Sequence, residues 1–121
     1  MKRRDTGILG EKLARDFLKQ RGYRILETNY RCPHGEIDIV ARQKDTLVFI
    51  EVRTKTSLEF GTPGETITPV KKERMRACGA YYQQAHHNLP QLWRLDVVAV
   101  ELNQRGKLSN IELIENAVGE E

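Results

Sequence analysis

The sequence predicts an α/β protein in which helices flank a mixed β-sheet. Three observations predict this fold. Apolar residues recur at helical spacing over residues 7–22, residues 23–55 hold three runs of strand-forming residues, and residues 68–85 predict a second helix before further β-rich runs. The resulting order is helix, three strands, helix and one or two strands, written αβββαβ(β). Hairpins that precede a crossover helix indicate antiparallel and parallel strand pairs in one sheet.

The first predicted helix, residues 7–22, is amphipathic. Its apolar side comprises Leu9, Leu13, Ala14, Phe17 and Leu18. Gly22 ends the helix, because glycine readily takes the left-handed conformation that follows a last turn. Gly7 and Gly10 have no side chains, so we expect this end of the helix to approach the sheet closely.

Three strands are expected over residues 23–30, 36–42 and 46–55. Residues 31–35 separate the first two strands, because the proline there cannot extend a ladder and the glycine suits a turn. Residues 43–46, Gln-Lys-Asp-Thr, predict a tight hairpin between the second and third strands.

A second helix is expected from Val70 to about Ala85. It follows a loop over residues 56–68 that contains glycine and proline. Thr68 has the side chain of an N-cap, and Pro69 suits the first helical position. The expected apolar side comprises Val70, Ala77, Cys78, Tyr81 and Ala85.

Two β-rich runs, residues 92–102 and 108–114, complete the expected sheet. A chain of 121 residues with 39% hydrophobic residues is long enough for one core and too short for two ordinary domains. We therefore expect a single domain over residues 1–121, with flexible tails at residues 1–6 and 115–121.

The composition also limits the cellular setting. The longest apolar stretches, residues 47–50 and 97–100, are far shorter than the roughly 20 residues of a membrane-spanning helix. The charged N-terminus lacks the apolar core of a signal peptide, so we expect a cytoplasmic protein without a membrane partner. Cys32 and Cys78 have no paired spacing, and we expect both to be reduced. The net charge of +3 is compatible with a polyanionic partner but does not identify one.

The predicted hairpin brings carboxylates onto one face of the sheet. If the turn is centred on residues 44–45, opposite partners have numbers that sum to 89. Asp38 then faces Glu51. Glu36 faces Arg53 on the same side, because strand side chains alternate.

Opposed like charges destabilise a hairpin by up to about 1 kcal/mol, so the pairing of Asp38 with Glu51 needs an offsetting interaction. A divalent cation is one solution, since Mg²⁺ is bound by one or two carboxylates together with water and phosphate oxygens. The other solution is a set of surface ion pairs, Glu36 with Arg53 and Lys55 with one of the two facing carboxylates. The spacing alone leaves both interpretations open.

Glu11 is a third candidate carboxylate. On a helical wheel it lies at the edge of the apolar arc, on a stripe with Gly7, Ala14 and Leu18. A glutamate in the first turn also complements the helix dipole, and position alone makes this structural role the simpler interpretation.

Two segments resemble a known nuclease signature. Gly-Glu-Ile-Asp at 35–38 and Phe-Ile-Glu-Val-Arg at 49–53 resemble the D-x(n)-E-x-K motif of the PD-(D/E)XK nuclease superfamily. More narrowly, the chain resembles the YraN family of bacterial proteins, which is similar to archaeal Holliday-junction resolvases. Further matching segments are Gly7-x-x-Gly10-Glu11, Asn29-Tyr30-Arg31, Phe60-Gly61, the helix start with Lys71, Lys72 and Arg74, and Arg94-Leu95-Asp96-Val97-Val98. The resemblance covers the chain from Gly7 to Leu102.

This resemblance implies a restriction-endonuclease-like fold, in which Glu11, Asp38 and Glu51 match the acidic positions of the motif. Arg53 stands in the lysine position, where the chain departs from the pattern. Arginine stays protonated, so it could hold a water or stabilise negative charge but could not act as a base. Lys55, on the same strand face, would substitute in part.

From these features we expect a metal-dependent endonuclease that hydrolyses phosphodiester bonds in structured or branched DNA, with DNA favoured over RNA. Asp38 and Glu51 would hold Mg²⁺ or Mn²⁺. Glu11 and Glu36 would assist through water. Similarity to junction-cutting enzymes also implies a homodimer, because two symmetric strands need two active sites. Two alternatives stay open: a nucleic-acid-binding module that does not cleave, and a protein-interaction domain whose acidic face binds a partner.

Basic residues crowd the start of the second predicted helix. They are Lys71, Lys72, Arg74 and Arg76. Their charge could reach phosphates beside the carboxylates. The alternative is a solvated helix face, since Glu73 lies among them.

Overall fold

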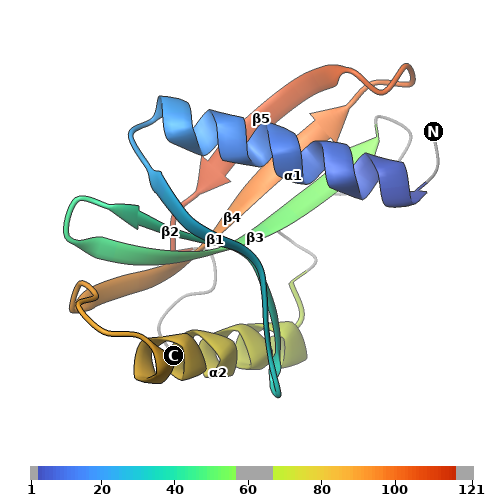
Figure 1. Ribbon diagram of the computed structural model, residues 1–121. Coiled ribbons are helices and arrows are strands. Elements are labelled where there is room, and N and C mark those ends of the chain that lie inside the picture. Colours follow the sequence, from blue (N-terminus) through green and yellow to red (C-terminus); the bar gives the residue numbers. More distant parts are fainter. Residues whose placement is uncertain (1–2, 57–66, 117–121) are drawn as a thin grey trace.

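The computed structural model describes residues 3–56 and 67–116, which form two helices and five strands (Figure 1). In chain order these are α1 (Arg3–Gln20), β1 (Arg24–Cys32), β2 (Gly35–Gln43), β3 (Thr46–Thr56), α2 (Pro69–Ala85), β4 (Leu92–Leu102) and β5 (Leu108–Ile114). The predicted element order is confirmed, and the final run is a strand.

The five strands form one mixed sheet in the order β1-β2-β3-β4-β5. Neighbouring strands are antiparallel except β3 and β4, which are parallel and are connected through α2. The two helices lie on opposite sides of the sheet (Figure 1). This is the mixed α/β arrangement expected of a restriction-endonuclease-like fold.

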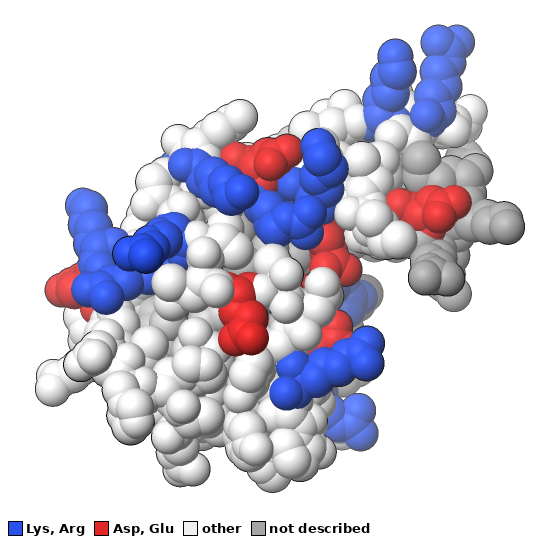
Figure 2. Space-filling view, in the orientation of Figure 1, with Lys and Arg blue, Asp and Glu red and all other residues white. Residues whose placement is uncertain are grey.

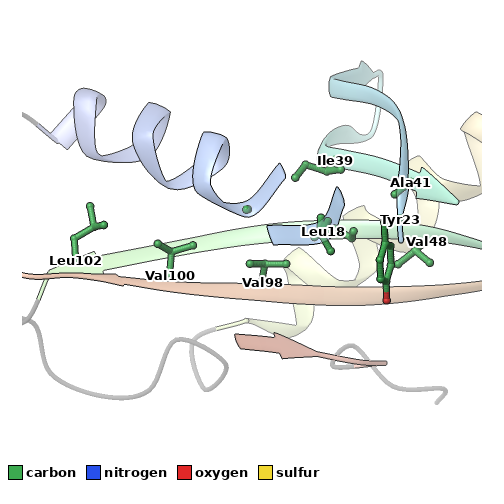
Figure 3. Close-up of a cluster of buried hydrophobic side chains, with 10 residues drawn as sticks. Leu18, Tyr23, Ile39, Ala41, Val48, Val98, Val100 and Leu102 are labelled. Atoms are coloured by element: carbon green, nitrogen blue, oxygen red, sulfur yellow. The ribbon is translucent and has the colours of Figure 1, made fainter. Parts of the chain in front are cut away.

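Helix α1 packs on one face of the sheet through its apolar side. Ala14 and Leu18 are fully buried and join side chains of β2, β3 and β4 in one core cluster (Figure 3). Gly10 lies against β3 so closely that an added Cβ would stand 2.9 Å from Cβ of Thr54. The expected close approach is therefore confirmed at Gly10, whereas an added Cβ at Gly7 would meet open space.

Helix α2 packs on the other face, but not with the side that we expected. Its buried residues are Met75, Cys78, Gly79 and Tyr82, which pack near Phe49 of β3. Val70, Tyr81 and Ala85 are exposed, so the predicted apolar side was wrong at these positions. The buried stripe contains a glycine, and an added Cβ at Gly79 would stand 3.0 Å from the Phe49 ring. Because glycine has no apolar side chain, the apolar pattern of the sequence does not predict that Gly79 is buried.

Several element boundaries follow from local chemistry. Thr68 caps α2, because its hydroxyl accepts a hydrogen bond of 3.1 Å from the backbone N–H of Lys71. Helix α1 begins at Arg3, so it includes residues 3–6, which we expected in a flexible tail.

Most of the predicted loop over residues 56–68 lies outside the described residues. Neither helix in the described ranges is long and apolar enough to cross a membrane.

Candidate active site

Strands β2 and β3 part from each other at the predicted carboxylates. Their ladder follows the expected register, in which paired numbers sum to 89, from the turn to the pair Ile39–Ile50. Beyond this pair, β2 continues beside β1, with Ile37 opposite Tyr30, whereas β3 continues beside β4. Asp38 and Glu51 are thus the first residues of a fork between the two strands. The tip of the β1–β2 hairpin reaches toward α2 (Figure 1).

Asp38 lies at the point where β2 and β3 separate. Its Oδ2 atom accepts a hydrogen bond of 2.8 Å from the backbone N–H of Val52. The side chain thereby satisfies a backbone donor at the point where the β2–β3 ladder stops. A second hydrogen bond joins the carboxyl groups of Asp38 and Glu51. The two carboxyl groups are therefore in contact, although their backbones are not ladder partners.

Glu51 is buried, with 7% of its surface exposed. The pKa of its carboxyl group is raised to about 8. Burial is the largest cause, and the hydrogen bond with Asp38 and the negative charge of Asp38 act in the same direction. Lys71 opposes this rise in pKa. At neutral pH the Glu51 carboxyl group is therefore mostly protonated, because burial and a nearby negative charge disfavour its ionised form.

Asp96 provides the contrast, since it and Glu51 are the charged residues buried within the described ranges. Asp96 accepts two hydrogen bonds from Nε of Arg94, at 3.1 and 2.9 Å, and one of 2.8 Å from the backbone N–H of Asn116. These partners give Asp96 a structural role in β4. Glu51 instead meets another carboxyl group, an arrangement that stability alone does not favour.

Two cations lie beside Glu51. The ammonium Nζ of Lys71 is 3.4 Å from Oε2 of Glu51, and Nη1 of Arg53 is 4.0 Å from the same oxygen. Lys71 comes from the first turn of α2, on the same stripe as Met75, Cys78 and Tyr82, and this stripe faces the sheet. The sequence pattern predicts Lys71 only as one of a group of phosphate-binding residues. The helical spacing that connects Lys71 with these buried residues could have predicted its side of the helix, but not its contact with Glu51.

Glu11 approaches the site from α1, on the other side of the sheet. Burial raises the pKa of its carboxyl group, and the negative charges of Asp38 and Glu36 raise it as well. Arg15 and a hydrogen bond from Asn29 act in the opposite direction. The structure thus brings Glu11 within electrostatic reach of Asp38. The alternative role in the first helical turn is wrong, because α1 begins at Arg3 and Glu11 lies beyond its first turn.

The expected pairing of Glu36 with Arg53 is wrong. Glu36 lies opposite Arg31 in the β1–β2 ladder, and its carboxylate is 3.4 Å from Nε of Arg31. The reason is the fork, because β2 has left β3 before it reaches Glu36. Lys55 lies four residues beyond Glu51 on β3, about 13 Å along the strand, and stands opposite Glu101 of β4 in the ladder.

The other basic residues of α2 differ in exposure. Lys72 and Arg76 are half-buried and Arg74 is exposed. An added Cβ at Gly35, in the β1–β2 turn, would lie 3.6 Å from Cβ of Arg74, so Arg74 stands beside the hairpin tip. On the face shown in Figure 2, basic and acidic side chains are interspersed.

The donor set suits a hard divalent cation that keeps much of its water. Within the described ranges, no group of three or more His, Cys, Asp or Glu side chains is placed to hold a metal ion. Asp38 and Glu51 form a contacting pair, and Mg²⁺ is commonly held by one or two carboxylates with water and substrate oxygens completing the shell. A divalent cation between them would also take the place of the Glu51 proton.

Comparison with known proteins places the chain in a family. The model for "Uncharacterised protein family UPF0102" matches residues 10–100, which include Glu11, Asp38, Glu51 and Lys71. The chain belongs to the UPF0102 family. This confirms the YraN-like resemblance, and the UPF0102 match covers both strands of the fork, α2 and the second half of α1.

UPF0102 relatives align over nearly the whole chain. A UPF0102 protein of Dehalococcoides mccartyi is 49% identical over 119 residues, which cover 98% of this chain and 97% of the relative. A UPF0102 protein of Moorella thermoacetica is 48% identical over 117 residues, which cover 97% and 98% of the two chains. One of Caldicellulosiruptor saccharolyticus is 42% identical over 117 residues, which cover 97% and 99%.

Proposed function

We propose that this protein is a Mg²⁺- or Mn²⁺-dependent endonuclease that hydrolyses phosphodiester bonds in structured or branched DNA. The observation that carries this proposal is the contact between the Asp38 and Glu51 carboxyl groups at the fork, with Lys71 beside Glu51. Asp38 and Glu51 would hold the cation. When bound, such a cation polarises a phosphate oxygen and makes a coordinated water more acidic.

The side chains around the pair have separate tasks. Glu51 would lose its proton to solvent when a cation binds, so that its carboxylate could hold the ion together with Asp38. Lys71 offers three N–H donors within reach of Glu51 and orients a water or a phosphate oxygen there. Arg53 stabilises negative charge on the phosphate without exchanging a proton. Lys71 therefore supplies an ammonium group in place of the motif's lysine, whose position is occupied by Arg53.

The remaining site residues act at longer range. Glu11 and Glu36 add negative potential, and Glu11 is positioned to orient a water beside Asp38. The basic residues farther along α2, Lys72, Arg74 and Arg76, contact phosphates that flank the cleaved bond. A homodimer would present two such sites to the two strands of a junction.

The proposal is tested by cleavage assays with Asp38→Asn. Wild-type protein is incubated with duplex, forked and four-way DNA, with and without Mn²⁺. We expect Mn²⁺-dependent products that fall by more than about 100-fold in Asp38→Asn, because a metal ligand is lost. Asp16→Asn is the matched control, since Asp16 pairs with Lys12 on the exposed surface of α1 and should keep full activity.

A second function is favoured by Arg53, which replaces the lysine of the motif. It is a nucleic-acid-binding module that keeps the fold without cleaving. Binding that weakens steeply with salt, with no products under any metal, would support this module. Absence of nucleic-acid binding at low salt would point instead to the third candidate, a protein-interaction domain.

A further inference from the structure

The two cysteines of the chain lie side by side although 46 positions separate them. Cys32 ends β1 and Cys78 lies in α2, and their Sγ atoms are 2.9 Å apart and share a hydrogen bond. Both are free thiols. The two sulfurs of a disulfide are about 2.05 Å apart, roughly 0.9 Å closer than these two Sγ atoms. The fold therefore creates a thiol pair that sequence spacing did not indicate.

The two thiols differ in environment. Cys78 is fully buried, and this burial, together with the neighbouring Cys32, raises the pKa of its thiol to about 12. Cys32 is half-buried and is followed by the exposed residues Pro33 and His34. The backbone N–H of His34 donates a hydrogen bond of 3.2 Å to Sγ of Cys32. Cys32 is thus the accessible nucleophile, and Cys78 keeps its proton until a partner sulfur is activated.

We propose that Cys32 and Cys78 form a reversible intramolecular disulfide when the protein meets a hydroperoxide. The thiolate of Cys32 attacks one peroxide oxygen, the O–O bond breaks, and Cys32 becomes a sulfenic acid while the leaving oxygen takes up a proton. Cys78 then attacks the sulfur of Cys32, the S–O bond breaks, and the proton of Cys78 leaves with that oxygen as water. Two thiols and one hydrogen peroxide give one disulfide and two waters, and the two sulfurs supply both electrons.

The position of this bond connects it with the fork. The cross-link would join the β1–β2 hairpin, whose second strand carries Asp38, to α2, which carries Lys71. Cys78 is seven residues after Lys71, so both project from the same side of the helix. The disulfide would therefore fix α2 against the hairpin and hold Lys71 in a constant position relative to the carboxylates. The thiol pair itself does not depend on nuclease activity.

The experiment is a titration of the folded full-length chain with hydrogen peroxide, followed by intact mass and free-thiol measurement. We expect loss of two hydrogen atoms and of both thiols, with full reversal by dithiothreitol. The melting temperature of the oxidised form should rise by roughly 10 °C, because a long loop is closed in the unfolded chain.

Two variants test the assigned order of attack. Cys78→Ser should stop at the sulfenic acid of Cys32, which gains one oxygen atom and reacts with dimedone. Cys32→Ser should remain unmodified at the same peroxide dose, because Cys78 is buried and protonated. Disulfide-linked dimers in place of the intramolecular bond, or oxidation of Cys32 to sulfinic acid without loss of the Cys78 thiol, would overturn the proposal.

Discussion

The stability of the protein should depend on pH through Glu51. The pKa of this carboxyl group is about 8 in the folded chain, above its ordinary value of 4.5. The folded state therefore holds the Glu51 proton more tightly than the unfolded state does. This stabilisation is fully present below about pH 4.5 and is lost as the pH rises through about 8.

The expected magnitude follows from these two pKa values. Each pH unit between them should lower the free energy of unfolding by roughly 1.4 kcal/mol, to a total of at most about 5 kcal/mol. Glu51→Gln removes the titrating group but keeps an amide N–H that can donate to Asp38. The variant should therefore lose this contribution to the pH slope.

The assay is urea unfolding of wild type and Glu51→Gln at a series of pH values from 5 to 8. The difference between the two curves isolates Glu51, because other titrating groups are common to both proteins. Glu112→Gln, on the exposed surface of β5, is the matched control and should keep the wild-type slope. Equal slopes for wild type and Glu51→Gln, or a difference of the opposite sign, would refute the raised pKa of Glu51.

Two further variants test the surroundings of the site. Lys71→Ala removes a cation that lowers the pKa of Glu51, so the pH at which the Glu51 contribution disappears should move upward in the same unfolding series. Gly10→Ala should lower the free energy of unfolding by about 1–3 kcal/mol, because its Cβ would press on Thr54 of β3. Gly7→Ala meets open space and should instead be neutral or stabilising by up to about 1 kcal/mol, and a Gly10→Ala variant as stable as Gly7→Ala would contradict the close contact.

Much of the fold could be predicted from the sequence because it depends on local signals. A few neighbouring residues determine each of three features: the apolar side of α1, the cap at Thr68 and the tight turn after β2. That turn also sets the register as far as the pair Ile39–Ile50.

The fork could not be predicted in this way. Whether β2 stays beside β3 or follows β1 depends on packing between distant segments, so the expected pairing of Glu36 with Arg53 failed. The same reason explains why Lys71 was not placed beside Glu51 and why the two cysteines were not brought together. These contacts depend on how α2 crosses the sheet, which local patterns do not contain.

The most direct test is to locate Mn²⁺ by its anomalous scattering in a crystal of the protein soaked with Mn²⁺ at pH 8 or above, where Glu51 can release its proton. We expect a peak between the carboxylates of Asp38 and Glu51 that binds an oxygen of each, and we expect it to be absent in Asp38→Asn crystals. A peak elsewhere with none at the fork, or an empty fork at saturating Mn²⁺, would contradict the assignment of these two residues as metal ligands.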